Sequence, residues 1–173
     1  MGRGRSYFVV RIAGGLGNQL FQYCFARSLA LTRNIQVFLD ISSYNNSSRR
    51  YLLSEFAAQQ DIVEEGTLQQ MLKWRDVFVY RAINKLLPTM QKKYYRERVG
   101  PTGMDERVNH LTGEKYLDGY WQNENYFQRF WEKIKSEVQL KQKSALCAEI
   151  QKEIEKVDSV SVHIRRGDYI NNP

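Results

Sequence analysis

Two short stretches of the sequence combine residue types that can hold a phosphate or a polar sugar group. The first is Gly14-Gly15-Leu16-Gly17-Asn18, whose small residues let backbone N–H groups come close to an anion. The second is residues 163–168, which contain His163, Arg165, Arg166 and Asp168. Two guanidinium groups can clamp phosphate oxygens, and a carboxylate can orient one of them. The second stretch therefore indicates a pyrophosphate-binding loop.

Both stretches also admit other interpretations. Gly15 and Gly17 fit part of a dinucleotide-binding fingerprint, with Asp40 as the ribose acceptor, although Leu20 occupies the position of the third glycine. A plain tight turn between a strand and a helix, needing positive φ, stays open as well. For residues 163–168 the alternative is a surface loop with an Arg–Asp ion pair.

The elements around the glycine stretch predict the fold class. Residues 7–12 are β-branched and aromatic and stop at two glycines, as a buried strand does before a turn. Asn18 is expected to cap a helix with apolar residues at three- and four-residue intervals, ending near Asn34. Residues 36–40 predict a second strand and complete a βαβ unit. This unit indicates an α/β fold on a parallel sheet.

The middle of the chain is less regular. Residues 44–115 contain few glycines and prolines and predict helices only near 64–73 and 77–87. Residues 116–121 predict a strand followed by a turn. Asn125 and Gln128 then have the spacing of a capping box, ahead of a helix with apolar residues at 127, 130, 131, 134 and 138.

The end of the chain predicts a helix and a strand. The helix follows from four apolar residues at helical spacing, Leu146, Ile150, Ile154 and Val157. Residues 159–164 alternate as a strand, which brings His163 and Arg165 together at its carboxyl end and turns Arg166 to the opposite side. Open α/β sheets bind their ligands at that end of their strands.

Composition limits the class of protein. With 173 residues, 42% hydrophobic and 13% aromatic, the chain can fill the core of about one domain and is neither disordered nor disulfide-stapled. Cys24 and Cys147 have neither metal-ligand nor paired spacing, so we expect reduced packing residues. No run of apolar residues is long enough to span a membrane, and the N-terminus does not resemble a signal peptide. We therefore expect a cytoplasmic protein without a metal site.

The net charge of +7 is concentrated in parts of the chain. Residues 73–98 hold eight basic residues against two acidic ones. Such a segment can contact nucleic acid, an anionic membrane face or a phosphorylated ligand, or it can be a solvated helix face. A peripheral contact with an anionic membrane therefore stays open.

Three blocks of the sequence resemble a known family. Residues 14–23, with Phe25-Ala26-Arg27, resemble the N-terminal signature of the α-1,2-fucosyltransferases of glycosyltransferase family 11. Residues 116–122, followed by Tyr126-Phe127, are similar to the mid-chain block of this family, and residues 162–169 to its first donor motif. Three blocks in the family's order are far more specific than one glycine loop.

The resemblance implies an inverting transfer of L-fucose from GDP-β-L-fucose to the 2-hydroxyl of a terminal galactoside. It also implies a two-domain, Rossmann-like fold of the GT-B type that requires no metal and binds no nucleic acid. Residues 1–157 would then form the acceptor-side domain. Residues 158–173 would be only the first strand and loop of an incomplete GDP-fucose-binding domain, so we expect this chain alone to be inactive.

The same resemblance assigns roles to individual residues. Arg165 would stabilise the negative charge that develops on the β-phosphate, while His163 and Asp168 shape the loop as further catalytic residues. Donor binding falls to five residues, Gly15, Gly17, Asn18, Arg165 and Arg166. The competing hypotheses are a nucleotide-dependent oxidoreductase that uses the glycine turn and Asp40, and a non-catalytic basic binding module.

Overall fold

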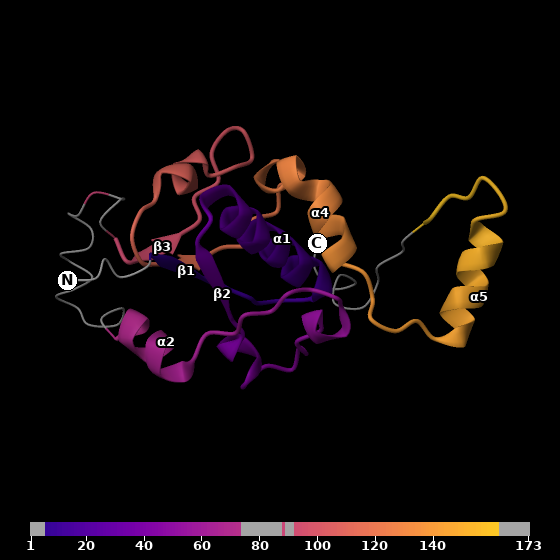
Figure 1. Ribbon diagram of the computed structural model, residues 1–173, viewed down its shortest axis with the longest axis horizontal. Helices are drawn as coiled ribbons and strands as arrows, with labels where there is room; N and C mark the ends of the chain where they lie inside the picture. The colour runs from indigo at the N-terminus through magenta and orange to yellow at the C-terminus, as the bar shows by residue number, and fades with distance from the viewer. Residues whose placement is uncertain (1–5, 74–87, 89–91, 163–173) are drawn as a thin grey trace, which may run out of the picture. The chain divides into compact units, whose positions relative to one another are not determined.

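The computed structural model describes residues 6–73, 88 and 92–162. Its helices and strands are β1 (Tyr7–Arg11), α1 (Leu16–Arg33), β2 (Gln36–Asp40), α2 (Glu65–Leu72), β3 (Tyr94–Arg96), β4 (Lys115–Asp118), α4 (Trp131–Glu137) and α5 (Ala145–Ile154) (Figure 1). The chain divides into two compact units, residues 1–140 and 141–173. The first unit carries the sheet and is described first.

The four strands form one parallel sheet in the order β2-β1-β4-β3. In the centre of the sheet, Val9 of β1 lies between Phe38 of β2 and Tyr116 of β4. The parallel α/β fold expected from the sequence is therefore confirmed. The sheet also includes β3, which the sequence did not predict, because three residues with a central tyrosine have no visible period.

Alternate side chains of the strands face opposite layers of helices. Phe8 and Val10 belong to the core cluster that also holds the buried apolar residues of α1 and Ile134 of α4. Val9 and Tyr116 pack in a second cluster with Met71 of α2. Because strand side chains point alternately to either face, the sheet is covered on both sides, as buried parallel sheets require. Figure 1 shows α1 running across one face of the sheet.

Helix α1 begins three residues earlier than the sequence suggested. Its N-cap is Gly15, whose carbonyl accepts the first helical hydrogen bond from the backbone N–H of Gln19 at 3.1 Å. Asn18 therefore lies inside the first turn, and the expectation that it caps the helix is wrong. The predicted end is confirmed, because Asn34 adopts the left-handed conformation with a φ of 52°.

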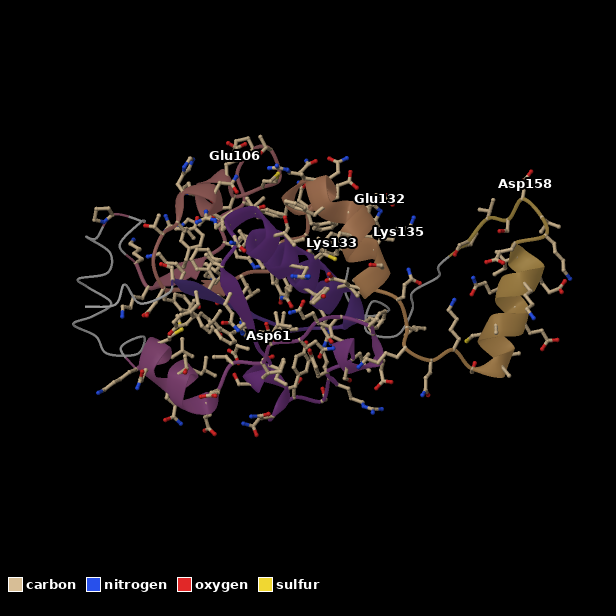
Figure 2. The ribbon with its side chains drawn as sticks, in the orientation of Figure 1. Asp61, Glu106, Glu132, Lys133, Lys135 and Asp158 are labelled. Atoms are coloured by element: carbon tan, nitrogen blue, oxygen red, sulfur yellow. The ribbon has the colours of Figure 1, made fainter. Side chains whose placement is uncertain are left out.

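The helix predicted from residue 125 is shorter than expected. Two 3₁₀ turns, Glu124–Tyr126 and Gln128–Phe130, precede α4, because Phe127 between them has a non-helical φ of −135°. The capping residue is Asn123, whose side chain accepts from the backbone N–H of Asn125. In α4, Ile134 is buried and the charged side chains labelled in Figure 2, Glu132, Lys133 and Lys135, are exposed.

The remaining predictions before residue 141 have mixed outcomes. The helix near 64–73 is confirmed as α2, and the strands at 36–40 and 116–121 as β2 and β4. The helix near 77–87 lies outside the described residues, as does most of the basic segment 73–98.

The second unit, residues 141–173, contains α5, which confirms the predicted helix. Ser144 caps it by accepting a hydrogen bond from the backbone N–H of Cys147 at 3.1 Å. Cys147 is exposed, so its expected packing role is wrong, whereas Cys24 is buried as expected. Residues 159–162 form no strand, and Val160 is 90% exposed. The rest of the expected strand 159–164 lies outside the described residues.

Candidate functional site

The carboxyl ends of three neighbouring strands bring charged residues to one edge of the sheet. Arg11 ends β1, Asp40 ends β2 and Asp118 ends β4. Arg11 stands directly opposite Asp40 in the strand register. Because ligands of open α/β sheets bind outside this edge, these residues delimit the candidate site.

Arg11 is held by a carboxylate of the neighbouring strand. Its Nη1 donates to Oδ1 of Asp118 at 3.0 Å, and the hydroxyl of Tyr94 donates to Oδ2 of the same carboxylate. Burial disfavours the charged form of Arg11, but the hydrogen bond and charge of Asp118 outweigh it and raise the Arg11 pKa. With 41% of its side chain exposed, Arg11 still presents part of its guanidinium to the solvent side.

Asp40 is part of the frame of the site. It is 2% exposed, and its carboxylate accepts from the hydroxyl of Tyr116 at 2.6 Å and from the backbone N–H of Ser42 at 2.8 Å. A carboxylate engaged in this way is not presented to a ribose. These contacts argue against the alternative interpretation in which Asp40 is the ribose acceptor of a dinucleotide-binding fingerprint.

The three glycines of the first stretch have different surroundings. Gly14 has a φ of +88°, and a Cβ there would lie 2.4 Å from Nδ2 of Asn18. A Cβ on Gly15 would lie 3.3 Å from Nη1 of Arg49, so this arginine reaches over the turn. A Cβ on Gly17 would meet no atom within 4 Å. The backbone conformation and the nearby Asn18 side chain therefore explain why residue 14 is a glycine, whereas Gly17 borders open space.

Two buried glutamines of α1 support the glycine turn. Gln19 donates to the carbonyls of Gly14 at 3.1 Å and Arg50 at 2.9 Å, and accepts from the backbone N–H of Leu52 at 2.8 Å. Gln22 accepts from the backbone N–H of Ala13 and donates to the carbonyl of Gly119. Both are at most 1% exposed. Neither glutamine was predicted to belong to the site, although amide side chains on the buried face of an amphipathic helix are a signal that the sequence offers.

A carboxylate clamps the loop that follows β4. One oxygen of Glu97 accepts from the backbone N–H groups of Tyr120 at 2.8 Å and Trp121 at 2.9 Å. Trp121 has a φ of +54°, is fully buried and stacks on Phe25 with ring centroids 4.0 Å apart. Tyr120 is 52% exposed. The clamp therefore places one aromatic ring in the core and the next in solvent, a distinction the sequence left open.

These elements surround an open cleft of about 410 Å³ at the carboxyl end of the sheet. Its polar lining includes Arg11, Asn18, Tyr44, Arg49 and Tyr120. The lining holds two guanidinium groups and no carboxylate among the described residues. Clefts of a few hundred Å³ with convergent polar groups are typical small-ligand sites. This cleft is the candidate site.

Tyr44 lines the cleft together with the two arginines. Its hydroxyl donates to the carbonyl of Gly14 at 3.0 Å. Burial raises the pKa of Tyr44 to about 12, and the nearby charges of Arg49 and Arg11 oppose this shift. The hydroxyl therefore keeps its proton at neutral pH, and Tyr44 contributes no negative charge to the cleft.

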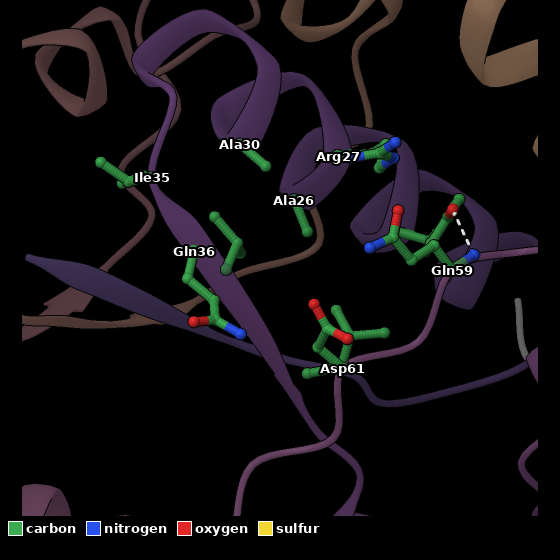
Figure 3. A pocket seen from close by; sticks show the side chains of 10 residues that line it. Ala26, Arg27, Ala30, Ile35, Gln36, Gln59 and Asp61 are labelled. Atoms are coloured by element: carbon green, nitrogen blue, oxygen red, sulfur yellow. Dashed lines mark hydrogen bonds between the residues drawn. The ribbon is translucent and has the colours of Figure 1, made fainter. Parts of the chain in front are cut away.

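A second cavity, of about 210 Å³, lies between α1, β2 and residues 59–61 (Figure 3). Ala26 and Ala30 line it from α1, and the backbone N–H of Gln59 donates to the hydroxyl of Tyr23 at 3.0 Å. Arg27 at its edge is already bound to Glu137, with Nε 2.7 Å from the carboxylate. This cavity therefore offers less polar chemistry than the cleft.

The structure describes three of the predicted site residues. Asn18 lines the cleft, Gly15 lies beneath Arg49, and Gly17 follows in the first turn of α1. The predicted residues of the last stretch, His163, Arg165, Arg166 and Asp168, lie outside the described residues. Arg49 and Glu97 were not predicted, because their proximity to the glycine turn and to Tyr120 depends on the tertiary fold.

The described part of the chain shows neither a metal-binding cluster nor a membrane-spanning helix. No three His, Cys, Asp or Glu side chains gather there in a way that could hold a metal ion. None of the helices in the same residues has the length and apolar character needed to cross a membrane.

Comparisons with known proteins extend over nearly the whole chain. The family model described as glycosyl transferase family 11 matches residues 5–173. An alpha-1,2-colitosyltransferase of Escherichia coli is 33% identical over 173 residues, covering 96% of this chain and 57% of that protein. The O-antigen biosynthesis glycosyltransferase WbnK of Escherichia coli is 28% identical over 182 residues, covering 94% of this chain and 59% of the relative. The chain thus spans a little over half of each relative. No solved structure gives a significant match.

Proposed function

Because this chain belongs to glycosyltransferase family 11, we propose that it serves the transfer of L-fucose from GDP-β-L-fucose to the 2-hydroxyl of a terminal galactoside. The observation that carries this proposal is the family match over residues 5–173, which includes both the glycine turn and the proposed donor loop. The name of the colitosyltransferase relative supports an α-1,2 linkage. The parallel sheet with a polar cleft at its carboxyl end is compatible with one half of a GT-B fold.

The chemistry requires a group that stabilises the departing diphosphate. The oxygen of the acceptor hydroxyl attacks the anomeric carbon, the bond between that carbon and the β-phosphate oxygen breaks, GDP leaves, and the hydroxyl proton passes to water. Attack on the face opposite the leaving group inverts the anomeric configuration. In our proposal Arg165 stabilises the charge on the leaving phosphate, and His163 and Asp168 shape its loop. A guanidinium can replace a divalent cation in this role, so we expect no metal requirement.

The described cleft would hold a part of the substrates. Tyr120 offers a half-exposed ring on which the apolar face of a sugar can stack, and Asn18 and Arg11 offer hydrogen-bond donors beside it. Aromatic platforms with a few polar groups are typical of sugar recognition. We therefore place the galactoside acceptor next to Tyr120.

Colitosyl transfer is a second candidate, supported by the 33% identity to the colitosyltransferase. Colitose is L-fucose without its 3-hydroxyl, so the two donors differ in one polar group. A site that hydrogen-bonds the 3-hydroxyl would reject colitose strongly, whereas an apolar site would discriminate weakly. Comparing kcat/KM for the two GDP-sugars with one galactoside, in two chimeras completed by the colitosyltransferase and by the second relative, distinguishes the candidates, because a donor preference shared by both chimeras belongs to this chain.

The test measures product formation by this chain and by a chimera that adds the remaining length of the colitosyltransferase relative. We expect turnover by the chimera and none by the 173-residue chain alone. In the chimera, Arg165→Ala should lower the rate by roughly 100-fold or more, and Arg166→Ala by less. Near-normal activity of Arg165→Ala would remove this residue from the mechanism. Transfer of neither sugar by a folded chimera that binds GDP would remove the proposed function.

A further inference from the structure

Arg49 is a cation of the cleft that lacks a carboxylate partner among the described residues. Arg11, by contrast, is neutralised by Asp118 at 3.0 Å. Arg49 is exposed, and its backbone N–H donates to the hydroxyl of Ser47 at 3.1 Å. Its guanidinium reaches to the surface of Gly15. The charge of the described lining is therefore positive and rests on Arg49.

The two arginines of the cleft, Arg11 and Arg49, come from separate parts of the sequence and meet in the lining of the same cleft. Both side chains line the cleft together with Tyr44. Because Asp118 neutralises Arg11, an anion in the cleft would be attracted mainly by the charge of Arg49, and Arg11 would contribute a hydrogen-bond donor.

Neutral donors stand beside the arginines. Oδ1 of Asn18 accepts from Nε2 of Gln122 at 2.7 Å, which fixes how the Asn18 amide is turned. Nδ2 of Asn18 then lies over Gly14, on the wall of the cleft. An amide NH₂ group in this position can donate to an oxygen in the cleft.

We infer that the cleft binds an oxyanion of a substrate, with Arg49 as its principal ligand and with Arg11 and Asn18 as additional donors. A planar guanidinium recognises phosphate and carboxylate oxygens by the same pair of parallel hydrogen bonds. The oxyanion therefore has two possible sources, the diphosphate of the donor and a carboxylate on an acidic acceptor sugar. The identification of the oxyanion with a substrate rests on the proposed function, but the binding itself does not.

Equilibrium binding to the 173-residue chain tests the inference without any need for turnover. The probes are inorganic pyrophosphate, GDP and galacturonic acid, with galactose as the uncharged match of the last. We expect Arg49→Gln to weaken anion binding about tenfold or more, the scale of a lost hydrogen bond to a charged group. Arg50→Gln, which changes an exposed arginine outside the lining, is the matched control and should bind like the parent chain.

Two further variants make the assignment specific. Arg49→Lys keeps the positive charge but loses the planar pair of guanidinium N–H donors. Its affinity for the anion should therefore lie between those of the parent chain and Arg49→Gln. Gly15→Ala places a Cβ 3.3 Å from Nη1 of Arg49 and should weaken binding without removing a charge. Arg165→Ala tests whether the other arginine-rich stretch accounts for binding instead. Equal melting temperatures of the variants show that all of them are folded.

Each outcome decides the inference. Tighter binding of pyrophosphate and GDP than of galacturonate, lost in Arg49→Gln, identifies the donor diphosphate; the reverse order identifies an acidic acceptor. No anion binding, equal binding by Arg49→Gln and Arg50→Gln, or loss only in Arg165→Ala overturns the inference. If anion binding depends on Arg49 but the folded chimera transfers no sugar, the proposed function is wrong and the oxyanion site still stands.

Discussion

Two glycines of the same stretch should respond to alanine in opposite ways. Gly14 has a φ of +88°, and a Cβ there would lie 2.4 Å from Nδ2 of Asn18. Gly17 lies inside α1, and a Cβ there would meet nothing within 4 Å. Comparing the stabilities of Gly14→Ala and Gly17→Ala therefore shows which glycine the folded backbone requires and which one it does not.

The magnitudes follow from the structure. A left-handed backbone costs an L-residue about 1–2 kcal/mol, and displacing the Asn18 amide costs its hydrogen bond to Gln122, about 1 kcal/mol. Gly14→Ala should therefore lower the free energy of unfolding by about 2–3 kcal/mol. Gly17→Ala should raise it by up to about 1 kcal/mol, because alanine favours the helix over glycine.

Urea unfolding of the chain, followed by circular dichroism, measures both changes with equal m-values as the check on two-state behaviour. The double variant Gly14→Ala with Asn18→Ala should lose less stability than the sum of its single variants, because the clash is then absent. A Gly14→Ala chain as stable as the parent, or a Gly17→Ala chain as unstable as Gly14→Ala, would refute the reasoning. If Gly17 also makes room for the donor, Gly17→Ala should bind GDP more weakly although it is more stable.

Three further predictions concern the frame of the cleft and its proposed acceptor. Glu97→Ala should destabilise the chain by about 1–3 kcal/mol, because the partly buried backbone N–H of Trp121 loses its acceptor while water can replace the acceptor of the exposed Tyr120 N–H. Glu97→Gln keeps one acceptor oxygen and should cost less in thermal unfolding, and equal losses in the two variants would contradict this role. Burial raises the pKa of Glu137, but the hydrogen bonds from Arg27 and Tyr23 outweigh burial and leave the pKa below its usual 4.5. The ionised carboxylate therefore stabilises the folded chain above pH 4.5, and this stabilisation is lost as the pH falls through the depressed pKa. Unfolding measured over this acid range should show a smaller pH dependence for Glu137→Gln than for the parent, and an unchanged slope would contradict the assignment. Tyr120→Ala should raise the KM for a galactoside by roughly 2- to 10-fold in the active chimera while Tyr120→Phe leaves it unchanged, and an unaltered KM in Tyr120→Ala would exclude stacking.

The sequence by itself predicted the elements whose signals are local. β1, β2 and α1 are visible because apolar side chains recur with the period of a strand or a helix and because glycines or Asn34 interrupt them. From these three elements the parallel α/β fold followed. The family resemblance likewise depended on short contiguous blocks.

Local signals failed where a distant partner decides the conformation. Asn18 has the residue type of a helix cap, but the carbonyl of Gly15 already begins the helix, and the Asn18 side chain bonds to Gln122, 104 residues away. β3 exists because Tyr95 pairs with Leu117 of β4. The spacing of neighbouring residues indicates neither the Asn18–Gln122 hydrogen bond nor the pairing of β3 with β4.

The site shows the same division. The glycine turn and Asn18 could be selected from the sequence, because small residues between a strand and a helix indicate a binding turn. Arg49, Glu97 and the different environments of Tyr120 and Trp121 were decided by the tertiary structure. The folded sheet brings the ends of separate strands and loops to one edge, and the contacts there join residues that the linear sequence keeps far apart.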